Sequence, residues 1–459
     1  MNQDKNIVVI GCGAGGGTAA QFARKTDRKA KITVFEKGKY PQYSKCGLPY
    51  VVSGRIPEFK DLIEFSEEWF KKANIDLFME TTVEQIDVKK QVIIAKKGKE
   101  IIEKPYSSLI MATGAKPSIP PIKNIYENDT LVDGVNVIRT IEDGKKIHSF
   151  VKKGKNATII GAGLIGLEMA CNIHKKGMNV TVIEALPNIL ANTLDEDMSN
   201  QVHEEISKNI SIFTNHLATK IESKNRKIHS VSKKNNETGE EEDIETDLLV
   251  ISTGCKPKIS LAKSAGCKIG KTGYITVNER SETSVEHVYA VGDCTEYKDF
   301  ITKKPLPIGL GSIVVRQAIA AGVNSAGGNY KLPDGVLQTC TTAFFDLEIA
   351  AVGSTVGGNA SVVSGKYKGS SLPGYFPGGK PITVKVFVDE GTGCILAAQA
   401  VGDNAAQRIN TFACAILSGM NIETLRKLET AYAPPVAPTL DAVTLACDIV
   451  SIKMNRRRR

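Results

Sequence analysis

A glycine-rich loop between two short apolar segments occurs twice in this chain, and each copy ends in a glutamate. The first copy comprises residues 5–10, the glycines Gly11, Gly13 and Gly16, and residues 31–36, which end at Glu36. The second comprises residues 155–160, the glycines Gly161, Gly163 and Gly166, and residues 179–184, which end at Glu184. In a G-x-G-x-x-G loop the glycines permit a tight turn, close approach to a pyrophosphate and close helix–strand packing. The sequence therefore predicts two Rossmann-type βαβ units, each able to bind a dinucleotide.

The two glutamates indicate which dinucleotides these are. A carboxylate at the end of the second strand can accept hydrogen bonds from ribose hydroxyls. At Glu184 it would repel a 2′-phosphate, and residues 185–187 contain no arginine, so NADH is favoured over NADPH, although a more distant basic residue could still accept NADPH. Two such sites in one chain suggest a tightly held flavin that takes hydride from a diffusible nicotinamide. We therefore expect FAD at the first unit and NADH at the second.

Three further turns belong to this pattern: ATG at residues 112–114, STG at 252–254 and YAVGDC at 289–294. Asp293 in the last turn would face the ribityl or pyrophosphate part of the flavin; the alternative is a simple turn aspartate. The predicted cofactor-binding residues comprise the glycines of both loops, the two glutamates and five further residues. These five are Lys37, Thr113, Gly114, Gly254 and Asp293. No metal site is predicted.

The order of these segments predicts an α/β fold with two interleaved Rossmann-like domains and a C-terminal α+β domain. The FAD-binding domain is expected over residues 1–120 and 247–332, with the NAD(P)H-binding domain over 121–246 between its two parts. Residues 333–459 alternate like antiparallel strands and then become helical over 404–428, which predicts a domain of another type.

One of the ten cysteines stands out by its position. Cys46 lies in PQYSKCGLPYVVSG (residues 41–54), ten residues after Glu36, and no pair of cysteines in the chain has CxxC spacing. A cysteine at the start of a helix has a lowered pKa, and the adjacent Lys45 could help. Without a partner nearby in sequence, Cys46 is expected to form a mixed disulfide with a small thiol or a sulfenic acid. The alternative is a buried structural cysteine, which is how we interpret the other nine.

Together these motifs resemble the pyridine nucleotide-disulfide oxidoreductase superfamily, and the solitary cysteine in SKCGLPY resembles its single-cysteine branch. That branch contains coenzyme A-disulfide reductases, coenzyme A persulfide or polysulfide reductases, NADH oxidases and NADH peroxidases. The resemblance covers nearly the whole chain. It implies bound FAD, NADH or NADPH as the reductant, and a homodimer formed through the C-terminal domain.

Features within the branch favour the coenzyme A reductases. The oxidases and peroxidases carry a histidine in the first loop where this chain has Ala14. PGYFPGGKP (373–381) and AYAPPVAP (431–438) are similar to segments of coenzyme A-disulfide reductases, which places Tyr375 and Tyr432 on two functional tyrosines. The resemblance implies that both tyrosines reach the flavin of the opposite subunit; the alternative is interface packing.

Two residues depart from the family pattern. Lys45 stands where the family often has asparagine or serine, and Phe376 replaces the second tyrosine of a YYPG segment. Both leave the main machinery in place but put the identity of the disulfide or persulfide substrate in doubt.

The sequence thus predicts a FAD-dependent NAD(P)H oxidoreductase that reduces coenzyme A disulfide or a related disulfide or persulfide, with Cys46, Tyr432 and Tyr375 as catalytic residues. One alternative is an NADH oxidase that reduces oxygen through a cysteine sulfenic acid. An alternative of another class is a flavoprotein that carries electrons to a protein partner or senses NADH.

Composition adds expectations about partners and compartment. The net charge of +9 suits an anionic substrate such as coenzyme A, and also a merely lysine-rich surface. Arg24, Lys25 and Arg28 are candidate phosphate contacts, with a solvated basic face as the equal alternative. No segment reads as a signal peptide or a membrane span, and the scattered cysteines suit the cytoplasm. Neither a nucleic acid nor a membrane is expected as a partner, and the closing arginines are expected to be a solvated tail.

Overall fold

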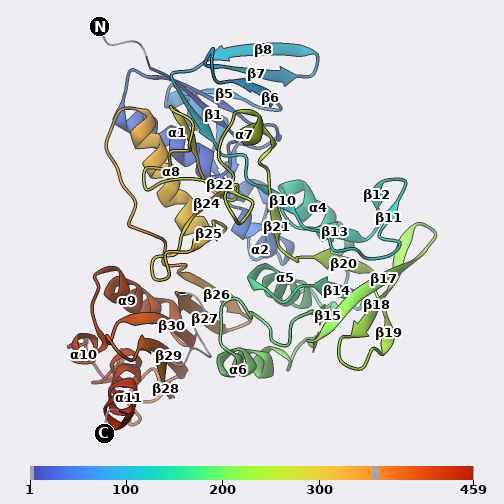
Figure 1. Cartoon of the computed structure of the whole chain (residues 1–459). Coiled ribbons are helices and arrows are strands. Elements are labelled where there is room, and N and C mark those ends of the chain that lie inside the picture. The colour runs from blue at the N-terminus through green and yellow to red at the C-terminus, as the bar shows by residue number, and fades with distance from the viewer. Residues whose placement is uncertain (1–4, 354–360, 458–459) are drawn as a thin grey trace. The chain divides into compact units, whose positions relative to one another are not determined.

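The computed structural model describes residues 5–353 and 361–457, which divide into two compact units. Unit 1 consists of Met1–Ser118, Arg139–Ile141 and Gly254–Val336, and unit 2 consists of Ile119–Ile138, Glu142–Thr253 and Leu337–Arg459. Figure 1 shows the elements of both units and labels most of them.

Unit 1 is built on a parallel sheet. Its strands are ordered β23 (Val288–Ala290), β9 (Ser108–Met111), β1 (Asn6–Ile10), β2 (Lys31–Phe35) and β5 (Asp76–Phe78). These strands are short. They are rich in β-branched residues because both faces of the sheet are covered. The glycine loop Gly11–Gly13 joins β1 to α1 (Ala14–Thr26), which confirms the first predicted βαβ unit.

The two faces of this sheet are covered differently. One face carries α1 and α8 (Gly311–Ser325), which lie side by side in Figure 1 and pack through alanines such as Ala19 and Ala318. The other face carries the antiparallel meander β6 (Thr82–Asp87), β7 (Val92–Lys97) and β8 (Glu100–Pro105). The sheet is therefore the middle of three layers.

Shorter elements complete unit 1. They are β3 (Gln42–Tyr43), the 3₁₀ turn η1 (Lys45–Gly47), α2 (Leu48–Val52), the 3₁₀ turn η2 (Phe59–Leu62), β4 (Ile63–Phe65), α3 (Glu67–Lys72), β10 (Ala115–Pro117), β21 (Cys255–Pro257), α7 (Ser260–Ser264), β22 (Ile275–Thr276), β24 (Thr295–Lys298) and β25 (Pro305–Pro307). β10 pairs antiparallel with β21, so the chain leaves unit 1 and re-enters it through two paired strands.

Unit 2 contains the second predicted βαβ unit. Its parallel sheet has the order β13 (Val135–Val137), β20 (Leu248–Ile251), β14 (Asn156–Ile160), β15 (Asn179–Ile183) and β16 (Ser211–Phe213). β20 pairs with both β13 and β14, so residues 248–251 belong to this sheet. The sequence pattern predicts them in the second part of the FAD-binding domain instead. The return to unit 1 occurs at Gly254.

Helices and a meander surround this second sheet. They are α4 (Ile141–Phe150), α5 (Leu164–His174), α6 (Glu196–Ile206), the small hairpin β11 (Tyr126–Glu127) and β12 (Thr130–Leu131), and the meander β17 (His216–Lys224), β18 (Lys227–Asn235) and β19 (Glu241–Glu245). The polar segment 224–243 lies in this meander, in β18 and the turns on either side of it.

The C-terminal part of unit 2 is an antiparallel sheet covered by helices. Its strand order is β26 (Cys340–Phe344), β27 (Leu347–Val352), β30 (Ile395–Gly402), β29 (Pro381–Asp389) and β28 (Val362–Ser370). Its helices are α9 (Ala405–Leu417), α10 (Ile422–Leu425) and α11 (Ala442–Arg457). The predicted α+β character is confirmed. Within the described part of the chain, every helix is too short or too polar to be a membrane span.

Candidate functional site

The first glycine loop has the geometry that its spacing requires. Gly11 has a φ of +97°, and a Cβ there would overlap the carbonyl oxygen of Ala112. A Cβ on Gly16 would overlap the carbonyl oxygen of Gly11, so only glycine lets α1 start this close to β1. A Cβ on Gly13 would meet no protein atom within 4 Å, which leaves the main chain open to a ligand at this point.

The second glycine loop repeats this geometry in unit 2. Gly161 has a φ of +101°, and a Cβ there would crowd the carbonyl oxygen of Ser252. A Cβ on Gly166 would overlap the carbonyl oxygen of Gly161, whereas one on Gly163 would meet nothing within 4 Å. The repeat therefore extends from the sequence pattern to the individual contacts of each glycine.

The two glutamates brace their loops in equivalent ways. Glu36 accepts main-chain N–H bonds from Cys12 (2.7 Å) and Gly38 (2.7 Å). Glu184 accepts them from Ala162 (2.6 Å) and Leu186 (2.9 Å). These bonds fix each carboxylate beside its glycine loop, where the sequence predicts ribose binding. The ribose contacts themselves stay a prediction.

The turn at Asp293 brings together segments that are far apart in sequence. The Asp293 carboxylate forms an ion pair with Arg139, and both side chains are about one-fifth exposed (21% and 19%). Arg139 belongs to unit 1 as part of the short segment Arg139–Ile141, although the longer segments on both sides of it belong to unit 2. Sequence reasoning missed Arg139 because it lies within the segment 121–246 that was expected to form the other domain.

The two ATG-type turns meet at the paired strands β10 and β21. The Thr113 hydroxyl donates to the Lys258 carbonyl (2.7 Å), and the Lys258 N–H donates to the Gly114 carbonyl (2.9 Å). Gly114 and Gly254 both have positive φ, at +65° and +89°. Thr113 and Gly114 thus help to hold this turn, and the contact also places Lys258, which sequence reasoning missed, next to the predicted site.

Four cations gather in unit 1 around this turn: Lys37, Lys45, Arg139 and Lys258. Burial, and then the charges of Lys37, Lys45 and Arg139, lower the pKa of Lys258 to about 8. Burial, followed by the charge of Arg139, also lowers the pKa of Lys45. Lys45 as a whole residue is exposed, so the burial that lowers its pKa concerns the surroundings of its ammonium group.

This cation cluster fits a dinucleotide diphosphate. Crowded cations lower one another's affinity for protons, and an anion placed among them relieves that repulsion. Asp293 and Glu36 are the two carboxylates near Lys45 that act against these charges, and the four cations outnumber them. With the opening at Gly13, the residues present are compatible with FAD at unit 1.

We expect FAD to bind the apoprotein less tightly as the pH rises through about 8. Below that pH Lys258 is protonated and attracts the diphosphate, whereas above it FAD binding must be accompanied by proton uptake. The affinity should fall by up to about tenfold per pH unit, the slope for one linked proton. Fluorescence titration of the apoprotein with FAD across this range measures it. A Lys258→Met variant should bind more weakly at neutral pH with a flatter profile; a flat wild-type profile would contradict the assignment.

Cys46 lies in the 3₁₀ turn η1 and is exposed, which excludes the alternative of a buried structural cysteine. The predicted helix follows it as α2, with Pro49 in its first turn. This helix has only five residues, so its dipole is weak and Lys45 is the nearer source of positive charge. The lowered pKa of Cys46 stays a prediction.

The other cysteines differ in their exposure. Burial raises the pKa of Cys171 and Cys447 to about 12, so these two are protonated thiols at neutral pH. Cys394 and Cys414 are exposed, which contradicts our interpretation of all nine as packing residues. All ten cysteines lie in the described residues, and none of them is in a disulfide.

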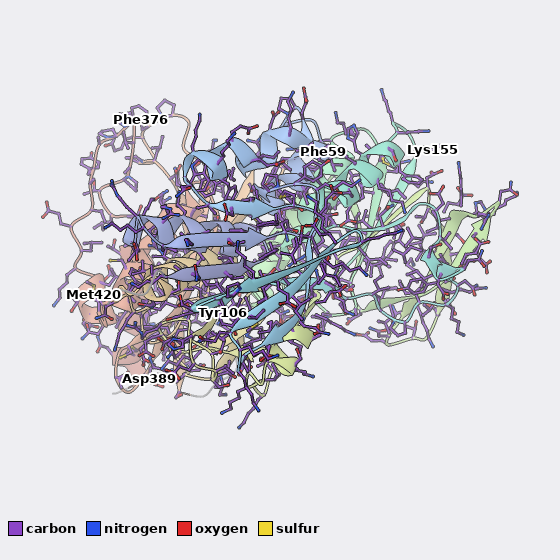
Figure 2. The ribbon with its side chains drawn as sticks, turned by 90° about the horizontal axis from the view of Figure 1, so that it is seen from above. Phe59, Tyr106, Lys155, Phe376, Asp389 and Met420 are labelled. Carbon is purple, nitrogen blue, oxygen red and sulfur yellow. The ribbon has the colours of Figure 1, made fainter. Side chains whose placement is uncertain are left out.

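The two predicted tyrosines lie together in unit 2. The hydroxyls of Tyr375 and Tyr432 are hydrogen-bonded at 2.8 Å, and both rings are exposed (71% and 49%). Tyr375 is on the loop between β28 and β29, where Figure 2 labels its neighbour Phe376. The bond from Tyr432 raises the pKa of Tyr375. Two exposed phenols that share a hydrogen bond can donate a proton to a ligand, but Cys46 belongs to the other unit.

The basic residues of α1 are not equivalent. The Arg24 guanidinium donates to the carbonyls of Ala73, Asp27, Arg28 and Asn74, at 2.6–3.3 Å. Arg24 therefore ties the end of α1 to the segment after α3, and its contact with a substrate phosphate stays a prediction. Lys25 and Arg28 remain exposed.

Comparisons with known proteins agree over nearly the whole chain. Residues 5–322 match the pyridine nucleotide-disulphide oxidoreductase family, and residues 339–443 match its dimerisation domain. The chain is 38% identical to an NADH oxidase from Methanocaldococcus jannaschii, covering 98% of this chain and 99% of the relative. It is 33% identical to an NAD(P)H coenzyme A polysulfide/persulfide reductase from Pyrococcus horikoshii, with coverage of 98% and 99%. The structure of an NAD-dependent persulfide reductase from A. fulgidus matches with a TM-score of 0.91 at 34% identity, covering 99% of this chain and 84% of the other.

Proposed function

This chain belongs to the pyridine nucleotide-disulphide oxidoreductase family, and we propose that it reduces coenzyme A disulfide, or a related small disulfide or persulfide, through Cys46. The family assignment makes it an NAD(P)H-dependent flavoprotein oxidoreductase with FAD as its cofactor. The dimerisation domain supports a homodimer. The ten thiols, none of them in a disulfide, suit a reducing compartment such as the cytoplasm.

The observation that carries the proposal is the exposed Cys46 beside a crowded group of cations. A thiol must be accessible to attack a disulfide, and positive charge nearby favours the reactive thiolate. The net charge of +9 also suits a substrate that carries phosphates, as coenzyme A does. The similarity to a reductase named for coenzyme A polysulfide and persulfide supports the same substrate class.

The proposed cycle has two steps at Cys46. The thiolate attacks one sulfur of the substrate disulfide, forms a mixed disulfide with one coenzyme A, and releases the other as a thiolate. FAD, which the first glycine loop and the cation cluster of unit 1 would hold, would supply the two-electron transfer from NAD(P)H to sulfur that the second step needs. Two electrons and one proton at the mixed disulfide then release the second coenzyme A thiol and restore the Cys46 thiolate. NADH, one proton and one disulfide are thus converted into NAD⁺ and two thiols.

The tyrosine pair gives the leaving thiolate a proton donor. We assign this role to Tyr432, whose hydroxyl is bonded to that of Tyr375, and place the pair against the site of the partner subunit. A phenol with a hydrogen-bonded neighbour can donate to a thiolate and regain a proton through that neighbour. The exposure of both rings in the single chain is compatible with this role.

A second candidate function is NADH oxidase activity, which the relative from Methanocaldococcus jannaschii favours by its name. Cys46 would then cycle through a sulfenic acid with oxygen as the acceptor. Ala14 counts against this alternative, because the resemblance places a histidine of the oxidases at this point of the loop. An electron carrier or NADH sensor would leave Cys46 idle.

The test is to identify what Cys46 carries in the purified protein and what it turns over. Mass spectrometry under non-reducing conditions is expected to show coenzyme A or an added sulfur on Cys46. Anaerobic turnover with NADH should then proceed with coenzyme A disulfide or persulfide. An oxygen adduct on Cys46, with turnover by oxygen alone, would replace the proposal by the oxidase.

A further inference from the structure

A buried glutamine in α8 contacts the turn that carries Asp293. Gln317 is fully buried, and its Oε1 accepts a hydrogen bond from the Gly292 N–H (2.9 Å). The Thr295 hydroxyl oxygen lies 3.2 Å from the same Oε1. Because a main-chain N–H can only donate, Oε1 must be the atom that faces Gly292. The orientation of this amide is therefore fixed by the turn that it contacts.

Both main-chain groups of Gly292 are held in this way. Its carbonyl accepts from the N–H and from the hydroxyl of Thr295, both at 2.8 Å, while its N–H donates to Gln317. Gly292 has a φ of +80°, which glycine adopts without steric cost; because glycine is also free to adopt other conformations, the hydrogen bonds to its two main-chain groups hold the turn in this one. The next residue is Asp293, whose carboxylate meets Arg139. Gln317 therefore helps to determine where the Asp293 carboxylate lies.

The Gln317 amide is not explained by packing alone. Its Nε2 is buried and has no hydrogen-bond partner among the described residues. A buried donor without a partner destabilises the fold, and an apolar side chain of similar volume would avoid that cost. The acceptor function of Oε1 at the Gly292 turn is the role that an apolar side chain could not supply.

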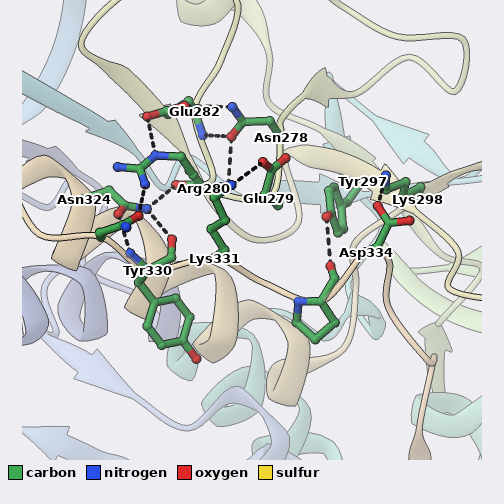
Figure 3. Close-up of polar contacts among 12 residues, drawn as sticks. Asn278, Glu279, Arg280, Glu282, Tyr297, Lys298, Asn324, Tyr330, Lys331 and Asp334 are labelled. Atoms are coloured by element: carbon green, nitrogen blue, oxygen red, sulfur yellow. Dashed lines mark hydrogen bonds and ion pairs between the residues drawn. The ribbon is translucent and has the colours of Figure 1, made fainter. Parts of the chain in front are cut away.

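A second buried amide of the same helix provides a contrast. Figure 3 shows Asn324 near the end of α8, where its Nδ2 donates to the carbonyls of Arg280 (3.0 Å) and Tyr330 (2.8 Å). Its Oδ1 accepts from the Tyr330 N–H (2.8 Å), so it fastens the end of the helix to the neighbouring loops. Asn324 forms no contact of this kind with the Gly292 turn, which makes it a matched control.

We propose that Gln317 is a positioning residue of the flavin site: by holding the Gly292 turn it places the Asp293 carboxylate for the ribityl or pyrophosphate part of FAD. The proposal rests on the assignment of Asp293 to that site. It adds a residue that never touches the cofactor and acts through the main chain of the turn.

The test compares variants of the full-length protein by their affinity for FAD, measured by fluorescence titration of the apoprotein. Gln317→Met keeps the volume and removes the acceptor, so FAD should bind at least about tenfold more weakly, as expected for one lost orienting hydrogen bond. Gln317→Glu keeps an acceptor oxygen whether protonated or ionised, and should stay within about threefold of wild type. Asn324→Leu should lower the melting temperature and leave the FAD affinity of the folded protein unchanged.

A double variant that combines Gln317→Met with Asp293→Ala tests the positioning role of Gln317 separately from the assignment of Asp293 to the flavin site. If Gln317 acts through Asp293, the effect of Gln317→Met should disappear in the Asp293→Ala background. Three results would overturn the positioning role. The losses of FAD affinity from Gln317→Met and Asp293→Ala could add in the double variant, Gln317→Met could bind FAD with wild-type affinity, or Asn324→Leu could lose as much FAD affinity as Gln317→Met. Unchanged FAD affinity in Asp293→Ala alone would instead overturn the assignment of Asp293, while the oxidoreductase activity through Cys46 would be unaffected.

Discussion

Replacement of Cys46 by serine is expected to abolish turnover of coenzyme A disulfide while FAD stays bound and is still reduced by NADH. Serine lacks a thiolate at neutral pH and cannot form the mixed disulfide, so the rate should fall by at least about a thousandfold. Cys46 lies in an exposed turn, so the substitution removes no core contact and the fold should persist. Steady-state oxidation of NADH with the disulfide as acceptor measures the effect.

The control for this variant is Cys394→Ser, another exposed cysteine that lies in unit 2. It should retain wild-type turnover. Reduction of a one-electron dye by NADH needs no thiol, and it should survive in the Cys46→Ser protein. If disulfide turnover persisted without the Cys46 thiol, the proposed function would be wrong, and the electron-carrier alternative would become the better explanation.

Alanine at the third glycine of each loop should separate the two nucleotide sites. In Gly166→Ala the new Cβ would overlap the Gly161 carbonyl oxygen and crowd the Ser252 hydroxyl, so the loop must shift. A displacement of about 1 Å at a binding loop can cost about a hundredfold, which is the loss expected in kcat/KM for NADH. FAD should remain bound, because the first loop belongs to unit 1. The corresponding Gly16→Ala protein should instead be purified without FAD.

Flavin absorbance and stopped-flow reduction by NADH measure these two effects independently. Gly163→Ala is the matched control, because its Cβ would meet no protein atom within 4 Å. It should leave the melting temperature unchanged, and any loss of NADH affinity would then reflect contact with the nucleotide itself. Wild-type reduction by NADH in Gly166→Ala, or a full complement of FAD in Gly16→Ala, would contradict the assignment of the loops.

The parts of the fold that sequence predicted well are those set by local pattern. The glycine spacing and the apolar runs around it predicted both βαβ units because each glycine is required by a contact within its own loop. The strand 248–251 was placed in the wrong domain because a buried parallel strand has the same apolar pattern in either sheet. β28 was not predicted because its glycines and lysines obscure the alternation expected of a strand.

The site was predicted less completely, because several of its residues are brought together only by the folded chain. Arg139 reaches Asp293 across 154 positions of sequence, and Lys258 joins the cation cluster through the pairing of β10 with β21. Gln317 gives no signal in the sequence, since a single amide in a helix is more often at the surface. Tyr375 and Tyr432 were found only through a resemblance, and their shared hydrogen bond could not be derived from spacing.

The interleaving of the two units has a consequence for how the protein is made on the ribosome. The sheet of unit 1 needs β23, and its face needs α8, yet both emerge after the whole segment 142–253 of unit 2. Chains fold progressively from the N-terminus during synthesis. Unit 1 therefore stays incompletely folded while the inserted βαβ unit is synthesised and folds. During that time β9 is an unpaired edge strand and one side of α1 is uncovered. We therefore expect FAD to be captured late in translation, once residue 325 has emerged and α8 can pack against α1.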